Sequence, residues 1–151
     1  MKIERVKDDM VGLRRTWMIR HDVFVEEQNW PVEEEVDEFD HDPRTTHVIA
    51  VSDEGEDLAT ARIIFEEPGR VRITRVAVNS HARGDGVGKE LMKGVARIAL
   101  EDYAVDGQVH LVLAAQEHAV PFYETLGYTR AEGGYEYVGI KHFEMDQTIT
   151  A

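Results

Sequence analysis

The most informative segment of the sequence is Arg83-Gly84-Asp85-Gly86-Val87-Gly88, which lies between a predicted strand at residues 70–78 and a predicted helix at residues 87–103. Glycines at alternate positions let the backbone adopt conformations that are closed to other residues and approach a ligand closely. The first N–H groups of a helix have no partner within the helix, and with the helix dipole they favour a phosphate group. Arg83 and Lys89 add positive charge at the two ends. The junction therefore predicts an anion-binding loop.

Two nucleotide-binding motifs fail at this loop. A Walker loop requires Ser or Thr after Gly-Lys, but Glu90 follows Gly88-Lys89. A dinucleotide fingerprint requires a third glycine where this chain has Lys89. Taken alone, the glycines are equally consistent with a flexible turn that precedes a helix.

The strand before the loop changes the parity of its apolar residues. Val71 and Ile73 are odd-numbered, whereas Val76 and Val78 are even-numbered. A strand that buries one face keeps its parity, so either both faces are buried or a bulge near residues 74–75 inserts one residue. A bulge would splay this strand from its neighbour and free backbone groups for a ligand.

The other elements follow from hydrophobic periodicity. A first helix, capped by Asp8 or Asp9, is predicted from the spacing of Met10, Leu13, Trp17 and Phe24. The helix at residues 87–103 has an apolar stripe of Leu91, Met92, Val95, Ile98 and Ala99. Strands are predicted at 47–52, 58–65, 110–115, 128–131 and 141–149, a helix at 119–126 and an acid-rich loop at 26–42. We expect one domain, residues 1–151, of the α/β (α+β) class, with a mixed central sheet of about six to seven strands flanked by helices.

Composition excludes several classes of function. The 30 acidic and 17 basic residues leave a formal net charge of −13, which repels polyanions and predicts no nucleic-acid binding. The absence of cysteine removes thiolate metal sites and a cysteine nucleophile. No membrane span or leader peptide is visible, so the expected location is cytoplasmic, away from membranes. The acidity is as typical of a halophilic protein as of an ordinary acidic bacterial protein. Asp40-His41-Asp42 lacks EF-hand spacing, and no required metal is predicted.

Two motifs in order resemble the GNAT superfamily of N-acetyltransferases. Residues 83–88 fit its pyrophosphate motif, Arg/Gln-x-x-Gly-x-Gly/Ala. Its second signature, a helix that carries Phe-Tyr and ends in Leu-Gly-aromatic, is similar to Ala119-Val120-Pro121-Phe122-Tyr123-Glu124-Thr125-Leu126-Gly127-Tyr128. The resemblance covers nearly the whole chain. It implies a splayed central sheet and direct transfer of an acetyl group from acetyl-CoA to a primary amine, with no covalent enzyme intermediate.

The resemblance also implies where acetyl-CoA binds. Its pantetheine arm would bond the backbone of the strand before the loop as an added strand, and its pyrophosphate would lie on the loop. The cofactor-binding residues are then Val76, Ala77, Val78, Arg83, Gly84, Asp85, Gly86, Val87, Gly88, Lys89, Gln116 and Phe122. Gln116 stands where many members have Asn, so an amide is kept on a longer side chain.

Catalysis needs a group for the leaving thiolate and a base for the acceptor ammonium. The resemblance places Tyr123 beside the thiolate, although an aromatic that packs on a helix face is the alternative. Glu35 is our candidate base, with Asp37 and Glu38 as alternatives, although most acids in this loop are expected to be solvated. His118, which begins the helix of Tyr123, and His142 are further candidates.

The N-terminal half carries a narrower resemblance to the ElaA-like branch of the superfamily. It rests on Arg20, Val23-Phe24-Val25, Glu27-Gln28, Glu35, Asp37, Asp40 and His47, with Ala115-Gln116 and the late Tyr-Glu and Gly-Ile-x-His segments. Part of this spacing also resembles acyl-homoserine-lactone synthases, which share the fold, bind a cationic nucleotide-like amine donor in this region and usually lack the coenzyme A loop. A third interpretation is an acyl-CoA-binding sensor without turnover.

The acid-rich loop predicts a small cationic amine as the acceptor, because its field attracts positive charge. The expected substrate-binding residues are Arg20, Asp37, Arg75 and His118; with Arg62, the arginines would pair with the acids or hold a substrate carboxylate. Edge strands in the C-terminal half are compatible with a homodimer.

Overall fold

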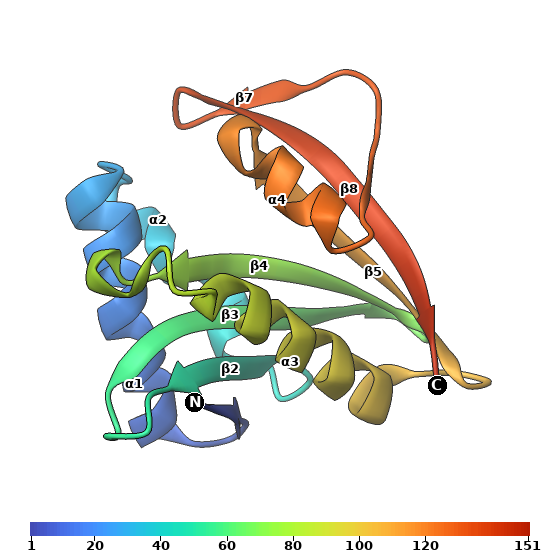
Figure 1. Cartoon of the computed structure of the whole chain (residues 1–151), viewed down its shortest axis with the longest axis horizontal. Coiled ribbons are helices and arrows are strands. Elements are labelled where there is room, and N and C mark those ends of the chain that lie inside the picture. Colours follow the sequence, from blue (N-terminus) through green and yellow to red (C-terminus); the bar gives the residue numbers. More distant parts are fainter.

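The computed structural model describes all 151 residues as one mixed sheet with helices on both faces (Figure 1). The sheet has eight strands in the order β1-β2-β3-β4-β5-β8-β6, with β7 paired to β8. Only β4 and β5 pair in parallel; the other neighbours are antiparallel. The strands are β1 Lys2–Val6, β2 Thr46–Val51, β3 Asp57–Glu67, β4 Arg70–Val78, β5 Gln108–Gln116, β6 Thr129–Arg130, β7 Tyr135–Tyr137 and β8 Ile140–Thr150. The predicted fold class is confirmed.

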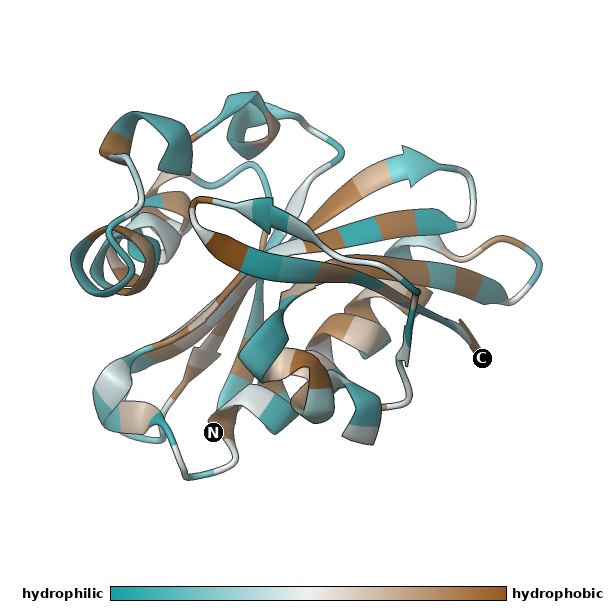
Figure 2. Cartoon of the chain, turned by 90° about the horizontal axis from the view of Figure 1, so that it is seen from above, coloured by the Kyte–Doolittle hydropathy of each residue, from teal (hydrophilic) through white to brown (hydrophobic).

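The sheet contains two strands that we did not predict. β1 has three polar residues among its five, and β7 is only three residues long, which is too short for alternation to identify a strand. Both are edge elements that depend on pairing, β1 with β2 and β7 with β8. Figure 2 shows hydrophobic residues interspersed with hydrophilic ones along the strands, and in β8 more buried and less buried residues alternate from Phe143 to Thr150.

Two helices cover opposite faces of the sheet. α3 (Val87–Tyr103) packs on one face, with its predicted stripe of five apolar residues fully buried. α1 (Met10–Arg20), which continues as a π-helix over His21–Glu27, packs on the other face. β2 lies between these helices and is therefore buried along its whole length, with Val48 in the α3 core and Ile49 in the α1 core. The short helices are α2 (Val32–Glu35) and α4 (Val120–Thr125).

The first helix differs in part from its predicted apolar stripe. Asp9 is its N-cap, as expected, and accepts a hydrogen bond from the Val11 N–H at 3.1 Å. Met10 is exposed, however, and Arg20 is buried in the helix–sheet interface. The apolar pattern could not show that Arg20 is buried. Burial of a charged side chain requires partners of opposite charge, and those of Arg20 come from another segment of the chain.

The acid-rich segment, which we predicted as a loop, is partly helical. It contains α2 and a 3-10 helix at Glu38–His41, whose N-cap Asp37 forms a capping box with Asp40. Glu35 and Asp40 are buried, whereas Glu33, Glu34 and Glu38 are exposed, as expected for solvated acids. The segment thus contributes internal ion-pair partners as well as surface charge.

The sheet splays between β4 and β5, as the motif resemblance implied. The two strands pair only from Arg70 to Ile73, opposite residues 110–113, although both continue beyond this point. Figure 1 shows β4 leaving β5 as an opening wedge. A bulge in β4 accompanies the splay, because β3 has one residue and β4 has two between the pairs Arg62–Thr74 and Thr60–Ala77. The inserted residue Arg75 has φ +53°, so the parity change in the sequence marked a bulge.

No helix in the structure combines the length and the apolar character needed to cross a membrane.

Candidate functional site

A cavity of about 860 Å³ lies at the splay. One wall is the end of β4 and the glycine loop, and the opposite wall is the end of β5 with the start of α4. The π-helix, Trp30 and the β7–β8 hairpin close the remaining side. Among the predicted cofactor residues, those that line the cavity are Val76, Ala77, Val78, Arg83, Gly84, Gly86, Val87, Gly88, Lys89, Gln116 and Phe122. Asp85 alone does not line it.

The glycine loop has the backbone conformation that its composition predicted. Gly84 and Gly86 have φ of +90° and +76°, and Gly86 is the N-cap of α3. A side chain at Gly86 would point into open space, so the glycine serves backbone conformation and access rather than close packing. The N–H groups at the start of α3 therefore face an uncovered loop beside the cavity, which suits an anionic group.

The two basic residues of the loop differ in their partners. Arg83 pairs with Glu27 of the π-helix at 2.8 Å and donates to the Val78 carbonyl at 3.1 Å. Lys89 lines the cavity and forms no ion pair. Glu27 is the only carboxylate on the cavity wall, and it is neutralised by Arg83. The wall thus carries a net positive charge near the loop.

Tyr123 lines the cavity from α4 and is buried against two other aromatic rings. Its ring meets Phe122 and Tyr128 edge-on, with centroids 5.1 and 5.8 Å away. Burial, with a smaller contribution from Tyr128, raises the pKa of Tyr123 well above its usual range. Because its pKa is raised, the hydroxyl stays protonated at neutral pH. It has no hydrogen-bond partner in the protein, so it is free to donate to a ligand in the cavity.

Two other predicted residues border the cavity near Tyr123. The Gln116 side chain donates a hydrogen bond to the Gln28 side chain at 2.8 Å and so joins β5 to the end of the π-helix. His118 is exposed and lines the cavity. The predicted amide position is therefore occupied by a side chain that braces the cavity wall.

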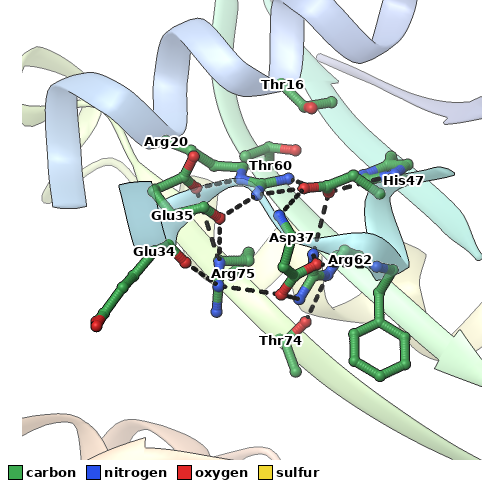
Figure 3. Close-up of polar contacts among 12 residues, drawn as sticks. Thr16, Arg20, Glu34, Glu35, Asp37, His47, Thr60, Arg62, Thr74 and Arg75 are labelled. Atoms are coloured by element: carbon green, nitrogen blue, oxygen red, sulfur yellow. Dashed lines mark hydrogen bonds and ion pairs between the residues drawn. The ribbon is translucent and has the colours of Figure 1, made fainter. Parts of the chain in front are cut away.

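A buried ion network lies between α1, the acid-rich segment and the sheet (Figure 3). Arg20 pairs with Glu35 and, at 2.7 Å, with Asp40. Arg62 from β3 pairs with the same Asp40 at 3.0 Å and with Asp37 at 2.7 Å. Burial alone would raise the pKa of Asp40, but the hydrogen bond and charge of Arg20, with the charge of Arg62, hold it well below its usual range.

Arg75 joins this network to the cavity. From the β4 bulge, its guanidinium donates to the backbone carbonyl of Glu35 at 3.1 Å and lies 5.4 Å from the Trp30 ring centroid. Burial, with the charges of Arg62 and Arg20, lowers the pKa of Arg75. Arg75 is therefore the one predicted substrate-binding residue of this network that lines the cavity.

The structure does not bring Glu35 to the predicted catalytic position. Its side chain is 4% exposed and bound to Arg20, and neither residue lines the cavity. Asp37 also lies outside the cavity, paired with Arg62. A carboxylate that is held by a buried arginine outside the cavity has no access to an acceptor amine. The acid-rich segment thus supports the fold behind the cavity and presents only Glu27 to it.

His47, from β2, predicts a pH dependence of stability. Burial lowers the pKa of His47 to about 4 from its ordinary 6.5. The unfolded chain binds a proton below pH 6.5 while the folded chain does not until about pH 4, so the free energy of unfolding falls as pH is lowered through this window. The expected change from this residue is up to about 3 kcal/mol.

Urea titrations at several pH values check this expectation. The variant His47→Met removes the group, and its stability should decline less than that of the parent between pH 6.5 and 4. The matched control is His21→Gln, at an exposed histidine, which should keep the parent slope. Parallel curves for His47→Met and the parent would contradict the assignment.

The aromatic wall of the cavity was not predicted from the sequence, although His142 was named as a candidate. Tyr135 and Tyr137 of β7 and His142 of β8 form it together with Trp30. Tyr135 stacks on His142 with centroids 5.7 Å apart, and Tyr137 meets both His142 and Trp30 edge-on. The Tyr-Glu and Gly-Ile-x-His segments were the available signal, but their role depends on a hairpin that the hydrophobic pattern does not show.

The structure contains no cluster of side chains suited to bind a metal ion. No three His, Cys, Asp or Glu side chains are grouped so that they would hold a metal ion. The acids that come together do so around arginines.

Comparison with known proteins agrees with this geometry. Residues 21–149 match the family model of the acetyltransferase (GNAT) domain. The uncharacterized N-acetyltransferase YjcF of Bacillus subtilis is 36% identical over 88% of this chain and 90% of its own. The crystal structure of Escherichia coli ElaA superposes with a TM-score of 0.84 at 27% identity, covering 97% of this chain and 98% of ElaA. An acyl-CoA N-acyltransferase from Pseudomonas aeruginosa gives a TM-score of 0.83 at 31% identity, with the same coverage.

The matched residues include the glycine loop, the splayed strands and the Phe122-Tyr123 helix. With the family model matching most of its length, the chain belongs to the GNAT family of N-acetyltransferases.

Proposed function

We propose that residues 1–151 form one N-acetyltransferase domain that transfers the acetyl group of acetyl-CoA directly to a primary amine. The observation that carries this proposal is the cavity at the β4–β5 splay, which joins the glycine loop to Tyr123. In the proposed complex the pyrophosphate lies on residues 83–89, and the pantetheine arm runs along the unpaired edge of β4. The thioester then lies near Tyr123.

The cavity provides the groups that the reaction needs at the cofactor. Backbone N–H groups and the Lys89 ammonium can bind the anionic pyrophosphate locally, although the net charge of the protein is negative. The Tyr123 hydroxyl donates to the thiolate that leaves coenzyme A, so charge that develops on sulfur meets a donor already in place. The Phe122 ring would lie 3.4 Å from a Cβ added at Gly88, so this helix and the loop are held in register.

The acceptor side gives no support to a polycationic acceptor. The cavity wall beyond the thioester is built from Phe24, Trp30, Tyr135, Tyr137 and His142, and the acidic side chains behind it are bound to arginines. A primary amine on an apolar or aromatic body fits this wall better than a polyamine does. A polyamine carries several positive charges and would require unpaired carboxylates on the wall.

A thiol-release assay tests the reaction. The protein is incubated with acetyl-CoA and a panel of amines, including polyamines and arylalkylamines, and free coenzyme A thiol is measured with the acetylated amine. Amine-dependent thiol release with the acetylated product supports the proposal. Cofactor binding without turnover on any amine would favour a sensor, and product from an acyl-carrier donor with S-adenosylmethionine would favour a synthase.

The proposed role of the glycine loop predicts that Gly86→Val affects both stability and coenzyme A binding. Gly86 and Gly55 have similar left-handed φ, +76° and +86°, and at both positions a Cβ would meet open space. Valine at either site should cost about 1–2 kcal/mol of stability from backbone strain. Only Gly86→Val should also weaken coenzyme A binding, by at least about tenfold, because its side chain covers the N–H groups that bind phosphate.

Isothermal titration with coenzyme A separates the two effects. Gly55→Val, in the β2–β3 turn and not among the residues that line the cavity, is the control for strain and should bind like the parent. Equal affinity in all three proteins would place the pyrophosphate elsewhere.

A further inference from the structure

His142 is held in the cavity with one ring nitrogen committed and the other free. Its Nδ1 lies 2.8 Å from the Ile140 carbonyl oxygen. A carbonyl only accepts, so Nδ1 must carry the proton and donate it. In the neutral ring Nε2 then has the lone pair, which is the tautomer that a general base needs.

The free nitrogen has access to the cavity. His142 is one of its lining residues, and no protein group hydrogen-bonds Nε2. Both ring nitrogens of His47 are also without partners, but they are sealed from solvent, whereas Nε2 of His142 is not. In the neutral ring, the accessible lone pair of Nε2 is therefore available to a ligand at this wall.

Packing fixes the direction of the imidazole ring. Tyr135 stacks on one face at an interplanar angle of 18°, and Tyr137 meets the ring edge-on at 81°. Both tyrosines belong to β7, which pairs with β8 through Tyr135 and His142 themselves. A base whose ring is fixed by two aromatic neighbours keeps its lone pair aimed at one place, which is what proton abstraction requires.

His142 lies at the same end of β5 as the helix of Tyr123, where the proposed complex places the thioester. In the sheet it lies directly across from Gln116, the last residue of β5, from which the chain enters the helix of Tyr123. The two walls that meet here carry a donor, Tyr123, and an acceptor, Nε2. No unpaired carboxylate lines the cavity: Glu27, the only one that lines it, is bound to Arg83, and Glu35 is bound to Arg20 outside it.

We propose that His142 is the general base of this acetyltransferase and that the acceptor amine binds between it and the thioester, against Tyr135 and Tyr137. The proposal rests on the proposed function. Nε2 takes one proton from the acceptor ammonium, and the nitrogen lone pair forms the C–N bond to the acetyl carbon. The C–S bond breaks with its electron pair on sulfur, which Tyr123 hydrogen-bonds. The second nitrogen proton ends on the thiol and His142 releases the first to water, so the products are the amide, coenzyme A thiol and one proton.

The tautomer is testable without any acceptor. Long-range ¹H–¹⁵N NMR of the protein, recorded without and with coenzyme A and with His142→Gln for assignment, should show that the neutral ring of His142 carries its proton on Nδ1. A ring protonated on Nε2 would overturn the proposal, whether or not the protein binds coenzyme A. This measurement therefore fails separately from the proposed function, which fails when coenzyme A does not bind or no amine is acetylated.

The basicity of the acceptor separates a base from a structural residue. The best amine of the panel, whose ammonium has a pKa near 10, is compared at pH 7.5 with its analogue fluorinated beside the nitrogen, which is largely neutral at this pH. His142→Gln should lower kcat/KM about 100-fold for the first amine and much less for the second, since a neutral amine needs no base. Coenzyme A affinity should not change.

His110→Gln provides the matched control. His110 lies on β5 at the paired end of the splay, bound to Asp146 at 2.7 Å and outside the cavity. This variant should acetylate both amines at the parent rate. An equal loss for both amines in His142→Gln would assign His142 a structural role and overturn the proposal.

Discussion

Replacement of Arg20 by methionine is expected to lower the free energy of unfolding by about 3–5 kcal/mol. The Arg20 side chain is 1% exposed and holds two buried carboxylates, Glu35 and Asp40. Methionine fills similar space but leaves these acids without their main counter-charge. The pKa of Asp40 would then rise, because burial opposes the Arg20 charge that now lowers it. Removal of one partner of a buried pair costs far more than the net contribution of the pair.

Urea unfolding at pH 7 measures this loss. Arg14→Met is the matched control, because Arg14 is exposed on the same helix, and it should change stability by less than about 0.5 kcal/mol. Arg20→Lys keeps the charge without the planar fork, so it should be intermediate and remains measurable if Arg20→Met does not fold. Equal stability of Arg20→Met and Arg14→Met would show that the network contributes little.

Replacement of Tyr123 by phenylalanine is expected to lower kcat by about 10²–10⁴-fold, the range for a proton-transfer group, with coenzyme A affinity nearly unchanged. The hydroxyl has no protein partner, so its removal leaves no buried group unsatisfied. The effect should therefore appear in turnover, where the thiolate leaves, and not in folding or cofactor binding.

Tyr128→Phe is the control for this prediction. Tyr128 is buried beside Tyr123, with ring centroids 5.8 Å apart, but it does not line the cavity. Burial raises the pKa of Tyr128 to about 12, so both hydroxyls remain protonated at neutral pH. Equal kcat in Tyr123→Phe, Tyr128→Phe and the parent would remove Tyr123 from the mechanism.

Features that depend on neighbouring residues were predictable from the sequence. The conformations of Gly84 and Gly86, the buried stripe of α3 and the bulge at Arg75 each leave a local mark, as glycine at a left-handed position, as apolar periodicity or as a change of parity. Together with the resemblance to the GNAT motifs, these marks predicted residues that line one side of the cavity, and the family match agrees with the motifs.

Features that depend on distant partners were not predictable. Glu35 and Glu34 are adjacent and identical in type, yet one is buried on Arg20 and the other is exposed. The strand β7 is too short for its own pattern to identify it, and its only strand partner is β8. For the same reason His142 could be named as a candidate but not placed.

By itself, the sequence determined the glycine loop and the helix that follows it, because the left-handed conformation of a glycine and the apolar periodicity of a helix are written in consecutive residues. Only the tertiary structure decided which acids are buried and which aromatic side chains line the cavity. Whether a carboxylate is solvated, catalytic or structural depends on which arginine reaches it, and here Arg20 and Arg62 come from a helix and a strand on either side of the acid-rich segment. The energy of a buried charge is set by such partners, and no local pattern records them.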